Sequence, residues 1–519
     1  MSTEPVATTA QGSFRGIRAT FGERVVHRFR GIPYAAPPVG ALRFAPPAPP
    51  PAARGAAPFD ATRYGAAPPQ RATPLTELLG MTPLVATSED CLTLNVDAPQ
   101  DADGPRPVLF WLHGGAYQTG TGAAATYDGL RLAARANAVV VTCNYRVGAL
   151  GFAYLDASGP PGAPRCANLG LLDQVAALEW VRAHVGAFGG DASRVTVVGE
   201  SAGAGSIHAL LAMPRARGLF AGAIAQSGAP DGFLLPQEAR ERTARLLDVL
   251  GVDARALAHA PADALLDAQE EVATERLWRT GMFFAPVVDG DVLPESPLEA
   301  AHAGRLAPVP LVVGTTRDEL QLYKYGAPRI DIPADAVANA LAGQLPGRAC
   351  GDRARAQRLV DVFRAGRAAR GESTDGLDLV YAIQADLAMR TPAARIAALH
   401  AARGHAAYAY RFTWASPLQD GALGACHALD CPFVFGTLDA APALVGDAPS
   451  ARAVSDAMID AWGRFAHGGA PACDAPGLGD WPRYDARERA TMEIGDPWRV
   501  VRAPAEEERL AIEALLDAA

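Results

Sequence analysis

The sequence predicts an α/β protein with a central, mostly parallel sheet flanked by helices. Apolar runs that suit buried strands recur along the 519 residues, and stretches with helical spacing separate them. One strand-to-helix junction carries the motif Gly-x-Ser-x-Gly at residues 199–203. The run before it, residues 195–198, is apolar and β-branched, whereas residues 204–213 after it are rich in Ala and Leu.

Ser201 at this junction is the candidate nucleophile. A sharp turn between strand and helix strains the serine backbone, while Gly199 and Gly203 leave room for the two elements to pass closely. The hydroxyl then projects from the edge of the sheet. The N-terminus of the following helix offers free N–H groups that can stabilise an anion.

The N-terminal part of the chain predicts an edge hairpin, with strands at 14–20 and 25–30 around a turn at Phe21-Gly22. The Pro-rich stretch 31–51 follows it. This stretch is too rich in Pro for regular structure and too apolar for a disordered linker. We therefore expect an ordered loop that packs on the body of the protein.

The next segments predict the core of the sheet. The strongly apolar strand 108–112 runs directly into His113-Gly114-Gly115-Ala116-Tyr117. A Gly-rich turn after a buried strand can direct backbone N–H groups into a cavity, although a simple tight turn would have the same sequence. Further strands are expected at 88–96, 138–145, 220–226, 309–314 and 405–412, and a helix is expected at 171–184.

Strands that alternate with helices bring their carboxyl ends to one edge of a parallel sheet, where ligands bind in open α/β folds. Two Ala-rich helical segments, near 236–273 and 331–399, are expected to be insertions that cover this edge. We expect residues 1–519 to form a single domain, because large α/β enzymes reach this length without division.

The overall composition excludes several functional classes. The chain is 49% hydrophobic and 20% charged, carries a net charge of −9 and has no basic cluster, which argues against a nucleic-acid partner. No apolar run approaches the roughly 18–20 residues of a membrane span. The N-terminus does not resemble a secretory signal, and the seven cysteines are scattered without metal-site spacing. We expect a cytoplasmic monomer or small homo-oligomer with reduced thiols and no metal site.

A serine hydroxyl needs a base, and that base needs an acid to orient it. In folds with this serine turn the chain order is serine, acid, histidine. Asp318 and Glu319 directly follow the strand at 309–314, so either carboxylate is suitably placed. His427 lies much later, in a loop of small residues. The sequence pattern alone does not single out this histidine among the ten in the chain.

Nearly the whole chain resembles the type-B carboxylesterase/lipase family, which includes cholinesterases and bacterial para-nitrobenzyl esterases. The resemblance implies an α/β-hydrolase fold and hydrolysis of carboxylic esters. It is carried by segments that occur in the family's order: residues 29–44, 88–96, 113–117, 144–148, 168–180, 188–191, 199–203, 226–228, 286–290, 314–319, 427–436 and 462–468.

The resemblance assigns a role to each residue of a catalytic triad. Ser201 matches the family's nucleophile, His427 its general base and Glu319 its acid. The family usually has Gly after the acid, whereas this chain has Leu320. Because that side chain can alter the loop, Asp318 remains an alternative acid.

The resemblance also implies an oxyanion hole, formed by the backbone N–H groups of Gly115, Ala116 and Ala202. Many relatives have Gly in place of Ala116, but a main-chain donor survives this difference. His113 is expected to shape the same loop. Glu200, Ser227 and Asp430 match residues that lie beside the triad and support it.

Other matches imply structural roles. Arg43 with Glu89, and Arg146 with Asp173, resemble ion pairs of the family. Cys91 matches one half of a disulfide of secreted relatives, but residues 64–68, where its partner would lie, contain no cysteine. This difference supports the expectation of reduced thiols.

The sequence therefore predicts a serine ester hydrolase that works through an acyl-enzyme and needs no cofactor. Amide or carbamate hydrolysis by the same triad is the alternative within enzymes. A catalytically silent binding module is the alternative outside enzymes, because the family has adhesion members that kept the fold and lost the triad.

Overall fold

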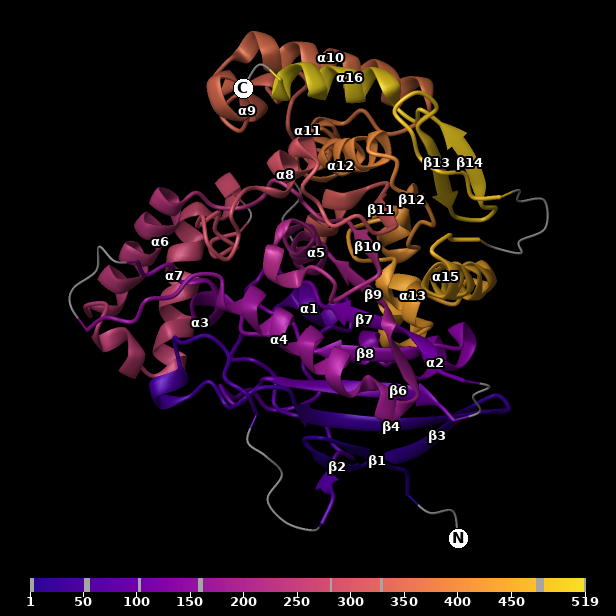
Figure 1. Cartoon of the computed structure of the whole chain (residues 1–519). Coiled ribbons are helices and arrows are strands. Elements are labelled where there is room, and N and C mark those ends of the chain that lie inside the picture. The colour runs from indigo at the N-terminus through magenta and orange to yellow at the C-terminus, as the bar shows by residue number, and fades with distance from the viewer. Residues whose placement is uncertain are drawn as a thin grey trace.

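The computed structural model contains a large mixed sheet that extends through the molecule from β3 to β14 (Figure 1). The structure describes residues 4–50, 57–100, 104–156, 162–280, 282–326, 330–472 and 480–517, without the side chains of 274–280. The spatial order of the strands in its described part is β14 (Arg499–Arg502), β13 (Ala490–Ile494), β12 (Ala407–Phe412), β11 (Leu311–Thr316), β10 (Gly222–Gln226), β9 (Gly190–Glu200), β7 (Arg106–Leu112), β8 (Val139–Cys143), β6 (Thr93–Pro99), β4 (Arg24–Pro33) and β3 (Ile17–Phe21).

The strands from β13 to β8 pair in parallel, and those at the two edges pair antiparallel. The carboxyl ends of β7, β9, β10 and β11 therefore meet along one edge of the sheet. This arrangement confirms the predicted fold class, and it brings the loops after Leu112, Glu200 and Thr316 together.

Helices cover both faces of the sheet, because apolar side chains of β7 point alternately to one face and to the other. Val108, Phe110 and Leu112 belong to the hydrophobic core on one face, whereas Leu109 and Trp111 belong to the core on the other. The first core includes α3 (Gly148–Phe152), α4 (Leu169–His184), α5 (Ala202–Ala212), α8 (Pro297–Ala303) and α12 (Thr391–Ala402). The second includes α2 (Leu130–Ala136), α13 (Cys431–Phe435) and α15 (Pro449–Gly468).

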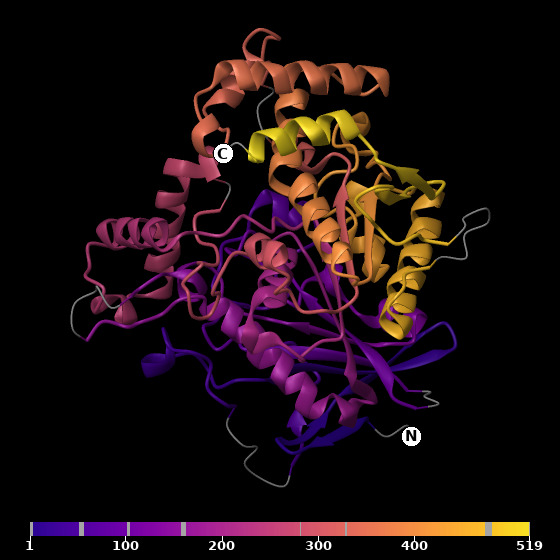
Figure 2. The same ribbon diagram turned by 45° about the horizontal axis from the view of Figure 1, so that its top comes forward.

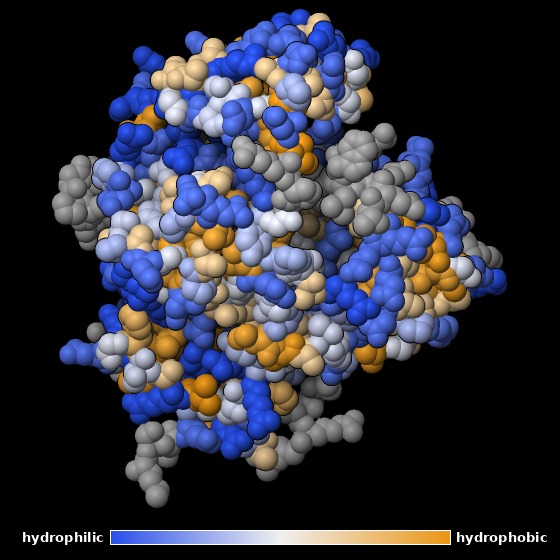
Figure 3. All heavy atoms as spheres, turned by 180° about the vertical axis from the view of Figure 1, so that it is seen from behind, coloured by the Kyte–Doolittle hydropathy of each residue, from blue (hydrophilic) through white to orange (hydrophobic). Residues whose placement is uncertain are grey.

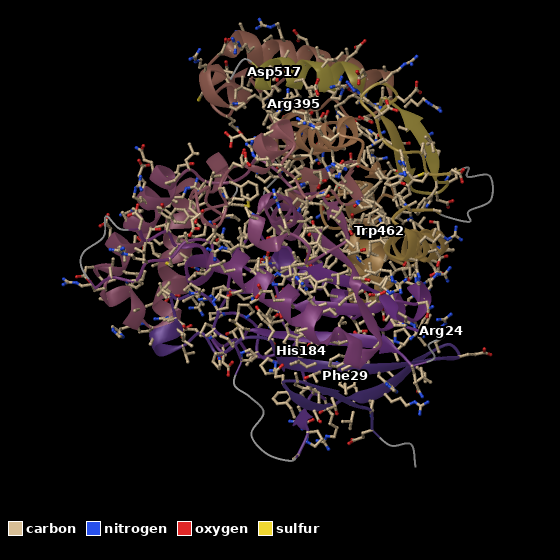
Figure 4. All side chains as sticks on the ribbon, viewed as in Figure 1. Arg24, Phe29, His184, Arg395, Trp462 and Asp517 are labelled. Carbon is tan, nitrogen blue, oxygen red and sulfur yellow. The ribbon has the colours of Figure 1, made fainter. Side chains whose placement is uncertain are left out.

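The helices of segment 331–399 pack in two different places. Its last helix, α12, packs against β11 and β12 and serves as the crossover between them. The others form a separate third core with the C-terminal helix: α9 (Val337–Ala342), α10 (Arg353–Ala369), α11 (Gly376–Ala385) and α16 (Glu506–Leu516). These helices lie together at the top of Figures 1 and 2. Arg395 of α12 pairs with Asp517 at 2.5 Å, which joins α16 to the sheet layer (Figure 4).

The other helical segment contains α6 (Pro236–Leu250) and α7 (Ala262–Thr280), which pack on each other beside α3 at the left of Figure 1. Arg43 fastens this pair to the body, because its guanidinium donates to three carbonyl oxygens between α6 and α7 as well as to Glu89. Two short helices remain, α1 (Pro74–Leu78) and α14 (Pro442–Val445).

The predicted strand at 14–20 is wrong, because the chain changes sheets at Gly16. Residues before it form β2 (Gly12–Arg15), which pairs with β1 (Val6–Thr9) and β5 (Phe59–Asp60) in a second sheet. A Cβ on Gly16 would lie 2.5 Å from the carbonyl oxygen of Arg28, so glycine alone permits this close crossing. The hairpin itself is present as β3 and β4.

The surface seen in Figure 3 mixes hydrophobic and hydrophilic residues over most of its area. None of the described helices combines the length and apolar character that crossing a membrane requires. Six cysteines in the described ranges are free thiols, Cys350 exposed and the others buried, while Cys473 lies outside those ranges.

Candidate active site

Ser201 lies at the turn between β9 and α5, with a backbone conformation of φ 57° and ψ −121°. Positive φ is strained for a residue with a side chain, and the surroundings hold it in place. The N–H of Ser201 donates to the carbonyl oxygen of Gln226 at 2.9 Å. A Cβ on Gly203 would lie 2.0 Å from the carbonyl oxygen of Leu112, so strand and helix approach too closely for any larger residue.

His427 is 8% exposed and is held by Glu319 through both side chain and backbone. Its Nδ1 lies 2.6 Å from Oε2 of Glu319, and its N–H donates to the carbonyl oxygen of Glu319 at 3.1 Å. The other oxygen of Glu319 accepts the N–H of Thr316 at 2.8 Å. The Glu319 carboxylate thus accepts the Nδ1 proton of His427, which leaves Nε2 free to accept a proton.

The carboxylate of Asp318, the residue before Glu319, has other partners. It accepts the N–H of Ala425 at 2.9 Å and pairs with Arg317 at 2.8 Å. It also lines an open, polar cavity of about 920 Å3 behind the loop. Asp318 therefore stabilises the backbone two residues before His427 and makes no hydrogen bond to the imidazole in the described part of the chain.

Glu200 is the residue next to Ser201 and lies close to the other nitrogen of His427. Its Oε1 is 3.0 Å from Nε2, and the carboxyl group is 1% exposed. The Ser201 hydroxyl makes no hydrogen bond to any described residue. Hydrogen bonds of a catalytic serine are often formed only once substrate is bound.

The pKa values of Glu200 and His427 depend on each other. Burial raises the pKa of Glu200 to about 8. Burial lowers the pKa of His427, but the charges of Glu200 and Glu319 outweigh burial and raise it to about 9. The two groups therefore compete for one proton. The charge of Glu200 favours the protonated imidazole, and loss of that charge favours the neutral imidazole, the form in which His427 accepts a proton.

The turn after β7 has a backbone conformation that suits the binding of an anion. Gly115, Ala116 and Tyr117 take φ values of 110°, 54° and 59° in succession. The N–H groups of Gly115 and Ala116 have no hydrogen-bond partner in the ranges that the structure describes. Ala202 is the first residue of α5, so its N–H lacks an acceptor within the helix.

His113 lies at the base of this turn and is completely buried. Its ring stacks on Tyr145 with centroids 4.2 Å apart, and Nδ1 lies 2.9 Å from the carbonyl oxygen of Gly114. Burial lowers the pKa of His113 to about 4, so the ring is neutral near pH 7. Since a carbonyl oxygen only accepts, the single proton is on Nδ1.

Asp430 belongs to a buried network behind His427. Its Oδ2 accepts hydrogen bonds from Tyr410 at 2.8 Å and Gln226 at 2.9 Å, and Gln226 in turn accepts from Trp462 at 3.0 Å. Burial raises the pKa of Asp430 to about 6. Trp462, labelled in Figure 4, belongs to α15. The network ties the histidine loop to β10, β12 and α15.

Ser227 follows β10 with a φ of 53°, is completely buried, and its hydroxyl has no partner among the described residues. Of the aromatic residues near the insertions, Phe283 and Phe284 are buried and pack edge to face at 4.9 Å. Tyr323 is half exposed, and partial burial together with the charges of Glu200 and Glu319 raises its pKa.

Both expected ion pairs are present. Arg43 lies 2.7 Å from Glu89, and Arg146 lies 2.7 Å from Asp173 in the interior. In the described ranges, no group of three or more His, Cys, Asp or Glu side chains is arranged to hold a metal ion.

Comparisons with known proteins identify the family of the chain. The family model described as "Carboxylesterase family" matches residues 3–512. The chain is 37% identical to the para-nitrobenzyl esterase of Bacillus subtilis (strain 168), with 98% of both chains covered. It is 35% identical to the phenmedipham hydrolase of Pseudarthrobacter oxydans, with 96% of both covered. It is 33% identical to the medium-chain fatty acyl-CoA hydrolase precursor of Anas platyrhynchos, over 94% of this chain and 88% of that protein.

Solved structures show the same similarity. A PNB esterase structure superposes with a TM-score of 0.85 at 35% identity, covering 98% of this chain and 99% of the other. The carboxylesterase of Geobacillus stearothermophilus superposes with a TM-score of 0.79 at 34% identity, with 98% and 99% coverage. Because the family model and these relatives span almost all of the sequence, the chain belongs to the carboxylesterase family.

Proposed function

We propose that this protein is a carboxylic-ester hydrolase in which Ser201 is the nucleophile, His427 the general base and Glu319 the orienting acid. One observation carries the proposal: Nδ1 of His427 donates to the carboxylate of Glu319, and its Nε2 lies 3.0 Å from the carboxyl group of Glu200, the residue directly before the strained Ser201. Membership of the carboxylesterase family supports the same reaction.

In the proposed reaction His427 removes the proton of Ser201 as its oxygen attacks the ester carbonyl. The N–H groups of Gly115, Ala116 and Ala202 stabilise the negative charge that develops on the carbonyl oxygen, each by roughly 10²–10³ in rate. His427 then protonates the departing alcohol. Water repeats the sequence on the acyl-enzyme, which releases the acid and regenerates Ser201.

Replacement of Ser201 tests the proposal. Ser201→Ala should lower kcat for p-nitrophenyl acetate by about 10⁶, as loss of a triad serine does. A fluorophosphonate probe should label the natural protein and leave this variant unlabelled. An unlabelled natural protein would identify a silent binding module, and normal turnover by Ser201→Ala would refute the nucleophile.

The substrate class can be narrowed with matched compounds. A panel of p-nitrophenyl esters of increasing acyl length reports the size of the acyl pocket. A p-nitrophenyl ester, the matching p-nitroanilide and the matching p-nitrophenyl carbamate compare the three reactions. We expect the ester to have the highest kcat/KM, because an amine leaves less easily than a phenol and the carbamate nitrogen makes the carbonyl less electrophilic.

We also propose a cytoplasmic location, a single domain over residues 1–519, and a monomeric or small oligomeric state. The free thiols support the location, and helical segments that share cores with the sheet or adjoin it support the single domain. Fractionation of cells and light scattering of the purified protein measure the location and the oligomeric state.

A further inference from the structure

The direction of the two oxyanion donors is determined by the carbonyl groups that precede them. In a trans peptide the C=O and the next N–H point in opposite directions within one plane. The carbonyl of Gly115 accepts N–H groups from Gln118 at 2.9 Å and Thr119 at 3.0 Å, which orients the N–H of Ala116. The carbonyl of Gly114 accepts from His113, which orients the N–H of Gly115.

The end of this turn is held by a buried side-chain amide from a distant part of the chain. Gln70, 8% exposed, accepts the N–H of Gly120 at 2.7 Å and donates to the carbonyl oxygen of the same residue at 2.9 Å. Its second amide proton goes to the carbonyl oxygen of Pro68 at 3.0 Å. Every polar atom of the Gln70 amide is therefore used, and both backbone groups of Gly120 are fixed.

The segment that carries Gln70 is itself anchored. The N–H of Ala67 donates to the carbonyl oxygen of Ala86 at 3.1 Å, and the carbonyl oxygen of Ala67 accepts the N–H of Ser88 at 2.8 Å. The amide of Asn144, at the end of β8, donates to the carbonyl oxygen of Ala66 at 2.9 Å. Gln70 thus connects the turn to a fixed part of the body instead of to a free loop.

Gly120 passes the constraint on to the oxyanion donors by direct contact. A Cβ on Gly120 would lie 2.2 Å from Nδ1 of His113 and 2.4 Å from the carbonyl oxygen of Gly114. The backbone of Gly120 therefore lies against the two groups that set the plane of the Gly114–Gly115 peptide. A shift of Gly120 would move both of them, because a close-packed interior transmits displacements.

We propose that Gln70 is a positioning residue for the oxyanion hole, holding Gly120 against His113 and Gly114 so that the N–H groups of Gly115 and Ala116 keep their direction. The inference rests on the proposed ester hydrolysis. The negative charge on the carbonyl oxygen exists only in the transition state and the tetrahedral intermediate, so a misdirected donor lowers kcat and leaves substrate binding almost unchanged.

Two variants test this role. Gln70→Ala removes the amide, and Gln70→Met removes its hydrogen bonds while it keeps the volume. We expect kcat for p-nitrophenyl acetate to fall about 10- to 100-fold in both, less than the loss of a complete donor, with KM changed less than about threefold. Affinity for an aryl trifluoromethyl ketone, which forms a tetrahedral oxyanion on the serine, should fall by the same factor as kcat/KM.

The chain offers a matched control in Asn168. Its amide accepts the N–H of Val287 at 2.7 Å and donates to the carbonyl oxygen of the same residue at 2.8 Å, and among the described residues it makes no hydrogen bond to the oxyanion turn. Asn168→Ala should lower the melting temperature at least as much as Gln70→Ala, because its φ of 55° also strains alanine. Its kcat and its ketone affinity should stay close to those of the natural protein.

Three outcomes would overturn the role of Gln70. These are a kcat no lower than that of Asn168→Ala, a ketone affinity that stays constant, or a loss expressed only in KM. The proposed hydrolase function fails separately, if Ser201→Ala stays active or the natural protein remains unlabelled by the fluorophosphonate.

Discussion

The chemistry of single side chains in this site depends on where one proton resides between His427 and Glu200. Glu200 loses its proton reluctantly because it is buried, and its charge, when present, holds a proton on His427. A base is useful only in its neutral form. The two carboxyl groups around the imidazole therefore differ in purpose: Glu319 orients His427, and Glu200 adjusts the pH at which it works.

Removal of the Glu200 charge should extend activity to more acidic pH. His427 acts when deprotonated, so kcat/KM rises as pH passes upward through its pKa. Glu200→Gln removes a cause that raises this pKa, and we expect the rising limb to move down by about one pH unit. Initial rates with p-nitrophenyl acetate from pH 5 to 9 measure the shift. A limb that stays in place or moves upward would show that Glu200 does not control the base.

Paired substitutions separate the two neighbouring carboxylates. Glu319→Gln should lower kcat by roughly 10³–10⁴, because the amide no longer holds the correct tautomer of His427. Asp318→Asn keeps an acceptor for the N–H of Ala425, so kcat should stay within about threefold of the natural value. Steady-state kinetics of both variants show which of the two carboxylates is the acid of the triad. A larger loss in Asp318→Asn would assign the acid to Asp318.

Among individual strands and helices, the junction of β9 and α5 shows most clearly how local sequence builds the site. Its glycines are required by contacts with the end of β7, and not by their own conformation alone. The same reasoning explains the hairpin that was predicted too long. Gly16 interrupts the strand because another backbone lies against it, and a neighbour that is distant in sequence leaves no local signal.

Addition of one methyl group at this junction should be costly. In Gly203→Ala the new Cβ meets the carbonyl oxygen of Leu112, whose strand is fixed between β8 and β9, and we expect a loss of about 3 kcal/mol in the free energy of unfolding. Gly186→Ala is the control, since nothing lies within 4 Å of its Cβ, and should change stability by less than about 0.5 kcal/mol. Urea denaturation provides both values. Equal losses would contradict the steric explanation.

Considered as one body, the described part of the chain contains three hydrophobic cores, which differ in size and composition. Two lie on opposite faces of the sheet and share its strands, whereas the third is formed by α9, α10, α11 and α16 together with Leu345 and Ala349 between α9 and α10. This helical core contains far fewer buried residues than either of the other two. It adjoins the acid loop, since α11 contacts the 3-10 helix Glu319–Lys324.

The helical core should open more easily than the sheet. We expect amides of α9, α10, α11 and α16 to exchange hydrogen together, and at least about tenfold faster than those of β7 and β9, because cooperative units with little buried area open first. Hydrogen exchange followed by mass spectrometry of peptides tests this. Exchange of the helical core as slow as that of the central strands would mean that the cores unfold as one unit.

Sequence patterns were sufficient to predict those features of the fold and the site that depend on neighbouring residues along the chain. The strand, the serine and the helix around Ser201 are contiguous, so their order and their strain could be predicted. The same holds for the apolar strands, because a run of consecutive apolar side chains indicates that a strand is buried. The strand β13 and the edge strand β14 beside it were missed, because they are short and carry charged residues.

Folding alone decided which side chains meet across long separations. Asp318 and Glu319 are adjacent and chemically alike, and only the path of the loop directs Glu319 to His427 and Asp318 to Ala425. Nothing around Gln70 in the sequence indicates its bond to Gly120, fifty residues later. Local patterns encode how a segment folds, but hydrogen bonds between distant segments depend on the packing of all the elements between them.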